Sequence, residues 1–72
     1  MTRYEQLETR LMNAVGVDDV DTKTQALEES AAPGYFEGLS DLEVIRLKTI
    51  RSDIWRTRLE VTAEQAQQRT AA

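Results

Sequence analysis

Residues 39–61 read LSDLEVIRLKTIRSDIWRTRLEV and decide the fold. Ser40 and Glu43 have the spacing of a capping box, in which a serine side chain and a glutamate side chain satisfy the first free N–H groups of a helix. Leu39 and Val44 occupy the two positions of a hydrophobic staple. No glycine or proline follows Gly38, so we expect one uninterrupted helix over residues 41–64. Its first 21 residues alone would span about 31 Å.

Two neighbouring stripes run along this long helix. The first contains Leu47, Ile50, Ile54 and Val61, recurs at helical spacing and is the expected core face, which Thr57 interrupts. The second is an arginine-rich ridge around the single tryptophan, and tryptophan and arginine are enriched among the residues that dominate binding at protein interfaces. The candidate partner-binding residues are Lys48, Arg51, Trp55, Arg58 and Leu59. The sequence leaves open whether Trp55 belongs to the core or to an interface.

A shorter first helix is expected over residues 3–15. Thr2 and Glu5 have capping-box spacing, and apolar residues recur at helical period from Tyr4 to Val15. Gly16 stands where a left-handed C-cap would end the helix.

The middle of the chain predicts a weaker second helix over residues 22–31, capped by Thr22 and followed by Pro33-Gly34. The loop after it holds Tyr35 and Phe36. We expect Phe36 to close one end of the core, and an exposed recognition loop is the alternative. Residues 65–72 are polar and alanine-rich, which predicts a frayed tail. These elements predict an all-α fold, a small helical hairpin or three-helix arrangement, in a single domain over residues 1–64.

Charge is distributed unevenly along the chain. The net charge is −4, and the acids are concentrated in the first 40 residues, whereas the last helix is rich in arginine. A negative chain with acids among its arginines is a poor nucleic-acid binder, so nucleic acid is an unlikely partner. The acidic half could instead pair with the basic half or present a surface to a basic target. The residues of this alternative acidic surface are Asp18, Asp19, Asp21, Glu28 and Glu29.

The composition argues against catalysis. The 72 residues include no histidine and no cysteine, which excludes the common nucleophile–histidine arrangements, the usual zinc ligands and disulfides. The acids at 18–21 lack the glycine and the closing glutamate of a calcium loop. We therefore expect no enzymatic activity, no cofactor, no metal and no small-molecule substrate.

The function expected from these features is structural. A long amphipathic helix on a small body predicts an assembly or adaptor protein that docks to a protein partner or forms a homo-oligomer. The alternative is a small acidic regulatory inhibitor, such as a DNA mimic or an anti-defence protein, that binds a basic target. The N-terminal residues do not read as a secretory signal and no apolar run could span a bilayer, so a cytoplasmic location, or incorporation into a larger assembly, is expected.

Both ends of the chain carry a resemblance to a known family. The opening Met1-Thr2-Arg3 and a last helix entered by Ser40-Asp41-Leu42 are similar to the small head–tail joining proteins of lambda-like phages. The resemblance implies a role in viral assembly. That family places a β-hairpin between its helices, whereas the middle of this chain, TKTQALEES over residues 22–30, has the pattern of a helix.

Overall fold

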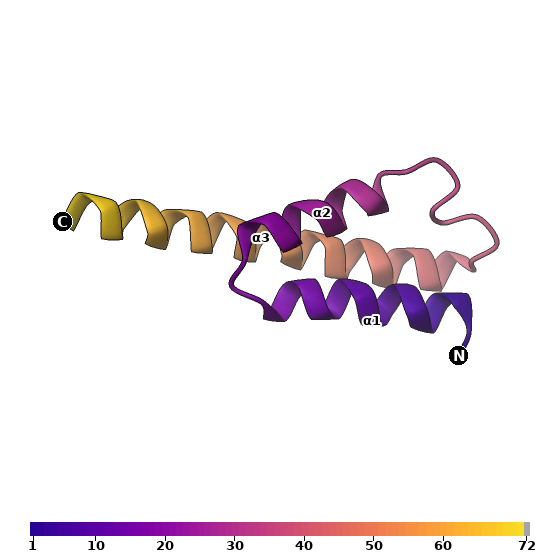
Figure 1. The fold of residues 1–72 in the computed structure, drawn as a ribbon. Coiled ribbons are helices and arrows are strands. Elements are labelled where there is room, and N and C mark those ends of the chain that lie inside the picture. The colour runs from indigo at the N-terminus through magenta and orange to yellow at the C-terminus, as the bar shows by residue number, and fades with distance from the viewer. Residues whose placement is uncertain (72) are drawn as a thin grey trace.

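The longest element of the computed structural model is the C-terminal helix α3, Asp41–Ala71, which packs against α1, Arg3–Gly16, and α2, Val20–Ser30 (Figure 1). The structure describes the backbone of residues 1–71 and the side chains of residues 1–68. Within that part of the chain all regular structure is helical, so the all-α three-helix arrangement is confirmed. The segment between the first and last helices is a helix and not the hairpin of the phage joining proteins.

The start of α3 is fixed by the predicted capping box. The backbone N–H of Ser40 donates to Glu43 Oε1 at 2.9 Å, and the backbone N–H of Glu43 donates to Ser40 Oγ at 3.2 Å. This reciprocal pair satisfies two of the donors that a helix N-terminus leaves free. Leu39 and Val44, the predicted staple, are both half-buried.

Helix α1 begins as predicted and ends differently. Thr2 is its N-cap and accepts a hydrogen bond from the backbone N–H of Glu5 at 3.2 Å. The left-handed C-cap expected at Gly16 is wrong, because Gly16 is the last helical residue and the cap, Val17, is extended with φ −92°. The last carbonyls of α1 receive a different donor, the side chain of Lys23.

Helix α2 starts earlier than the predicted residue 22. Its N-cap is Asp19, whose carboxylate accepts from the backbone N–H of Thr22 at 3.2 Å and also from the Thr22 hydroxyl. Asp19 therefore fills the role that we had expected of Thr22, since a carboxylate at a helix N-terminus also interacts favourably with the helix dipole. The helix ends at Ser30, and Gly34 and Gly38 in the following loop have φ of 78° and 80°.

The core lies where the three helices meet. Its fully buried apolar residues come from every helix: Leu11, Ala14, Ala26, Leu27, Leu47 and Ile54. Phe36 packs against this cluster, as predicted. The Tyr35 ring meets the Phe36 ring edge-on, with 5.1 Å between the two ring centroids. Arg3 holds the same loop in place, because its guanidinium donates to the backbone carbonyls of Gly34, Tyr35 and Glu37.

Helix α3 extends well past its neighbours. In Figure 1 its C-terminal part projects from the body formed with α1 and α2. The molecule measures 49 × 21 × 17 Å, and its radius of gyration of 14.0 Å exceeds the roughly 11 Å of a compact chain of this length. Val61 is the last buried residue, and residues 62–68 are exposed.

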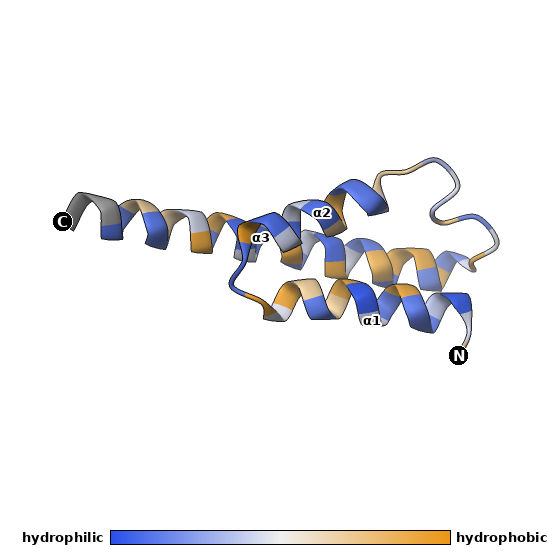
Figure 2. Ribbon diagram, in the orientation of Figure 1, coloured by the Kyte–Doolittle hydropathy of each residue, from blue (hydrophilic) through white to orange (hydrophobic). Residues whose placement is uncertain are grey.

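The frayed tail predicted for residues 65–72 is wrong over residues 65–71, which continue the helix; Ala72 lies outside the described residues. Glutamine, glutamate and alanine are good helix formers, and no glycine or proline interrupts them. Figure 2 shows hydrophobic and hydrophilic residues interleaved around α3, so the helix does not have a single apolar side.

Candidate partner-binding surface

The predicted ridge on α3 is partly exposed. Trp55 and Leu59 have exposed fractions of 49% and 64%, and Lys48 is also exposed, whereas Arg51 and Arg58 are half-buried. Trp55 is therefore not a core residue, which answers the question that the sequence left open. Trp55 and Leu59 lie one turn apart, and exposing about half of an indole and most of a leucine side chain to water is unfavourable for a chain with so few large apolar residues.

Arg58 holds the indole on one side. Its guanidinium lies 5.3 Å from the centre of the Trp55 ring, and its Nε donates to Thr24 Oγ1 of α2 at 2.9 Å. This contact fixes the cation over the ring, where the negative face of the indole attracts it. The arrangement is therefore ordered before any partner arrives.

The expectation that Arg51 would also flank Trp55 is wrong. Arg51 and Lys48 lie over the Phe36 ring instead, at 5.9 and 5.7 Å from its centre. They are drawn there because Phe36 closes the end of the core beside the first turns of α3. The ridge thus divides into a Phe36 part, with two cations, and a Trp55 part, with Arg58 and Leu59.

A shallow groove runs beside Trp55 between α2 and α3. It has a volume of about 240 Å³. Its lining residues are Thr24, Leu27, Glu28, Ala31, Trp55 and Arg58. The groove joins the exposed indole to the edge of the core at Leu27, so an apolar side chain of a partner would contact both.

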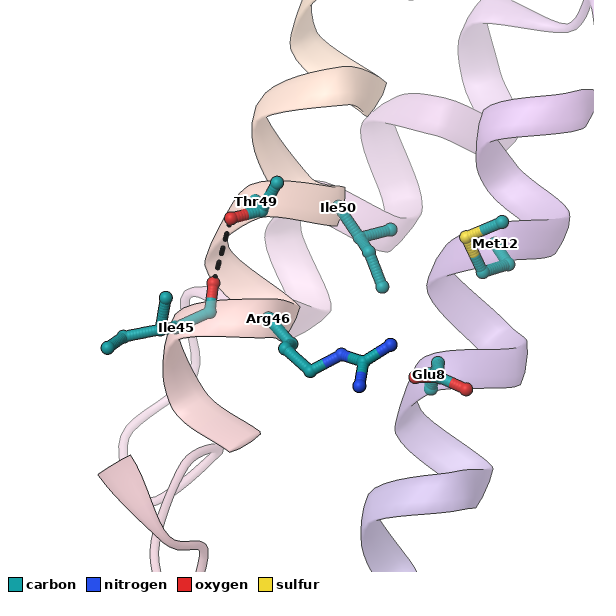
Figure 3. A pocket seen from close by; sticks show the side chains of 6 residues that line it. All are labelled: Glu8, Met12, Ile45, Arg46, Thr49 and Ile50. Carbon is teal, nitrogen blue, oxygen red and sulfur yellow. Dashed lines mark hydrogen bonds between the residues drawn. The ribbon is translucent and has the colours of Figure 1, made fainter. Parts of the chain in front are cut away.

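A second groove, of about 390 Å³, lies between α1 and α3. Figure 3 shows Met12 and Glu8 of α1 on one side and Ile45, Arg46, Thr49 and Ile50 of α3 on the other, with the Arg46 side chain directed toward α1. Beside it, the Tyr4 hydroxyl donates to Glu8 Oε2 at 2.6 Å, and this hydrogen bond raises the pKa of Tyr4. This groove could not be predicted from the sequence, because it is formed by the packing of two helices.

The sequence reasoning also missed the buried Lys23. Only 1% of this residue is exposed, and its Nζ donates to the carbonyls of Ala14 and Val15 at 2.9 Å each and to Thr57 Oγ1 at 2.8 Å. Three acceptors match the three donors of the ammonium group. A signal existed, since the buried residues of α2, at positions 23, 26, 27 and 30, have the i, i+3, i+4, i+7 spacing of one helical face.

The alternative acidic surface is divided by local contacts. Asp19 is the cap of α2, and hydrogen bonds from Thr22 hold its pKa below the ordinary value. Glu29 forms an ion pair with Arg10 at 3.1 Å, which lowers the pKa of its carboxyl. Asp18 and Asp21 are exposed near the start of α2, and the exposed Glu28 lines the groove beside Trp55.

Comparisons with other proteins add nothing to this geometry. No protein-family model matches the chain, and no curated protein or solved structure shows significant similarity to it. Over the described residues, no helix has the length and apolar character needed to cross a membrane. The same part of the chain contains no group of three or more acidic side chains placed to hold a metal ion.

Proposed function

We propose that this protein is a non-enzymatic assembly or adaptor protein that docks to a protein partner through α3. The observation that carries the proposal is the mismatch between helix and body. A 31-residue helix spans about 46 Å, whereas the 14 residues of α1 span about 21 Å. Helices this long are normally stabilised by packing along their length, and here the side chains of residues 62–68 are exposed.

The Trp55 part of the ridge supplies the chemistry of the contact. Trp55 and Leu59 offer apolar area, and Arg58, fixed by Thr24, offers a cation beside it. Burying a half-exposed indole removes apolar surface from water at little entropic cost, because tryptophan has only two rotatable side-chain bonds. The partner that fits is an apolar helix or loop with an acidic residue placed to meet Arg58.

Several cations of the chain are already occupied, which favours a protein over a nucleic acid. Arg10 pairs with Glu29, Arg56 pairs with Asp53 at 3.3 Å, and Lys23 is buried. Arg3 is bound to loop carbonyls. Phosphate binding depends on clustered free cations, so a net charge of −4 with these contacts leaves little attraction for a nucleic-acid backbone.

Site-specific photocross-linking tests this proposal. A photoreactive aromatic amino acid, which keeps a large apolar ring at the site, replaces Trp55 in one variant and the exposed Asn13 of α1 in a control, and both are expressed in cells that naturally contain the protein. We expect a discrete cross-linked protein from position 55 and none from position 13. Equal labelling at the two positions, or no product at position 55 with the variant folded, would refute docking at this surface.

A further inference from the structure

The side of α3 that faces away from the core carries a seven-residue repeat of its own. When heptads are numbered with Asp41 at position g, the buried residues Leu47, Ile54 and Val61 all fall at position f. Position f is opposite the line formed by positions a and d. The core of the monomer therefore uses one side of α3 and leaves the coiled-coil side of the same helix outward.

Positions a and d form one exposed line, which we call the seam. Its apolar members are Leu42, Ile45, Leu59, Ala63 and Ala66, and the first three have exposed fractions of 75%, 59% and 64%. Its polar members, Thr49, Ser52 and Arg56, are also exposed. The seven-residue spacing runs through residues 41–68, which is four heptads, and three of the four a and d positions in the two middle heptads are polar.

We propose that the seam pairs with the seam of a second copy of this chain in a parallel two-stranded coiled coil. This inference rests on the proposed function, because it names the partner for the same helix. α1 and α2 pack against the side of α3 that carries Leu47 and Ile54, and Ile45 and Thr49 of the seam border the groove between α1 and α3.

The charges beside the seam specify the second copy and its direction. In a parallel pair, position g of one helix faces position e of the next heptad on the other helix. That places Asp41 opposite Arg46 of the second copy, and Lys48 opposite Asp53 of the second copy. Symmetry repeats both contacts, so four complementary pairs flank the seam. In the monomer Asp41, Arg46 and Lys48 are exposed, and Asp53 is half-buried.

The antiparallel direction matches less well. There, position e faces position e, and a register that brings Arg46 opposite Glu60 of the second copy also brings Asp53 opposite Asp53. The parallel direction has a cost of its own, because Arg56 at position a faces its equivalent. That charge already has a counter-ion, since Arg56 Nη2 lies 3.3 Å from Asp53 Oδ1 of its own helix. Polar residues at position a, here Thr49 and Arg56, lower the stability of a coiled coil, so the dimer is weak and concentration-dependent.

Sedimentation equilibrium of the full chain over a wide concentration range tests the dimer. We expect the mass to rise from 8.2 kDa toward twice that value. Ile45→Asp should lower association at least tenfold, because it buries a charge in the seam. The matched control is Met12→Asp, which changes an apolar residue of similar exposure, 53%, on α1 and should leave association unchanged. Circular dichroism confirms that both variants are folded.

The absence of cysteine allows a direct test of direction. In the parallel pair Thr49 faces Thr49 of the second copy, so Thr49→Cys should form a disulfide-linked dimer on mild oxidation, whereas Asn13→Cys should not. Exchanging a flanking charge, Lys48→Glu, should weaken the dimer, and adding Asp53→Lys should restore it.

Three outcomes would overturn the inference. A folded chain that stays monomeric at all concentrations contradicts self-pairing, yet leaves the proposed docking to a different protein intact if position 55 still cross-links to one. A dimer lost in Met12→Asp but kept in Ile45→Asp places the contact on α1 and not at the seam. A dimer in which Thr49→Cys forms no disulfide refutes the parallel register.

Discussion

Lys23 Nζ donates a hydrogen bond to Thr57 Oγ1 at 2.8 Å, and this contact joins α2 to α3. The same ammonium group binds the last carbonyls of α1, those of Ala14 and Val15. A cation at a helix C-terminus interacts favourably with the helix dipole, and here it replaces the glycine cap that α1 lacks. One buried lysine of α2 therefore ends α1 and fixes the position of α3.

Removing the acceptor on α3 should destabilise the fold. Thr57→Val keeps the shape of the side chain but leaves the buried ammonium one acceptor short, so we expect the free energy of unfolding to fall by about 1–2 kcal/mol. Urea denaturation followed by circular dichroism measures it. Thr62→Val is the matched control, since the Thr62 hydroxyl also donates to a carbonyl one turn back but is exposed. Equal changes in the two variants would mean that the Lys23 contact contributes nothing.

The stability of the fold should be more sensitive to a substitution of Ser40, in the capping box of α3, than to one of Ser52. Ser40→Ala removes the side-chain acceptor of the Glu43 N–H, and we expect a loss of about 1 kcal/mol in the free energy of unfolding. Ser52→Ala, in the middle of the same helix and exposed, should change stability little or raise it slightly, because alanine is the better helix former. Thermal and urea denaturation of the two variants compare them directly, and a larger loss at Ser52 would contradict this account of the helix start.

The free energy of unfolding should fall at acidic pH. The hydrogen bond from Arg10 lowers the pKa of Glu29, and the hydrogen bonds from Thr22 lower the pKa of Asp19. A carboxyl with a lowered folded-state pKa stabilises the fold fully above its unfolded-state pKa, near 4 for these residues, and that stabilisation disappears as the pH falls through the folded-state pKa.

The difference in unfolding free energy between wild type and Glu29→Gln should therefore be present at pH 7 and vanish in strong acid. Glu28→Gln serves as the control, because Glu28 takes part in no ion pair among the described residues. A Glu29 difference that persists unchanged at the lowest pH would show that the Arg10 contact is not its cause.

The projecting end of α3 should contribute little to folding. Ending the chain at Glu64 removes side chains that are exposed where they are described, at residues 65–68. We expect the unfolding free energy of the monomer to change by less than about 0.5 kcal/mol. Differential scanning calorimetry at low protein concentration measures it, and a drop of several degrees in Tm would show that this end stabilises the body.

The sequence predicted what depends on neighbouring residues. The Ser40–Glu43 box and the absence of glycine after Gly38 specify α3 locally, and the apolar stripe from Leu47 to Val61 identifies its buried side. Phe36 could be predicted as a core residue because large aromatic groups are scarce in this chain. These features can be predicted without knowing which residues of the other helices they contact.

What the sequence could not predict depends on contacts between helices. The C-terminus of α1 looked as if it needed Gly16, because nothing local revealed that Lys23 would supply the donors. The ridge looked continuous, but Phe36 draws Arg51 and Lys48 away from Trp55. The grooves on either side of α3 likewise exist only after the helices pack.

The central claim is that Trp55 binds a partner more than it stabilises the fold, and the variant Trp55→Ala tests it most directly. Because half of the indole is already exposed, Tm of the dilute monomer should fall by less than about 8 °C. Binding to the partner identified by cross-linking should weaken at least thirtyfold, as at an interface hot spot. Met12→Ala, which removes a similarly exposed apolar side chain from α1, should change neither quantity. Loss of Tm with binding unchanged would contradict the account.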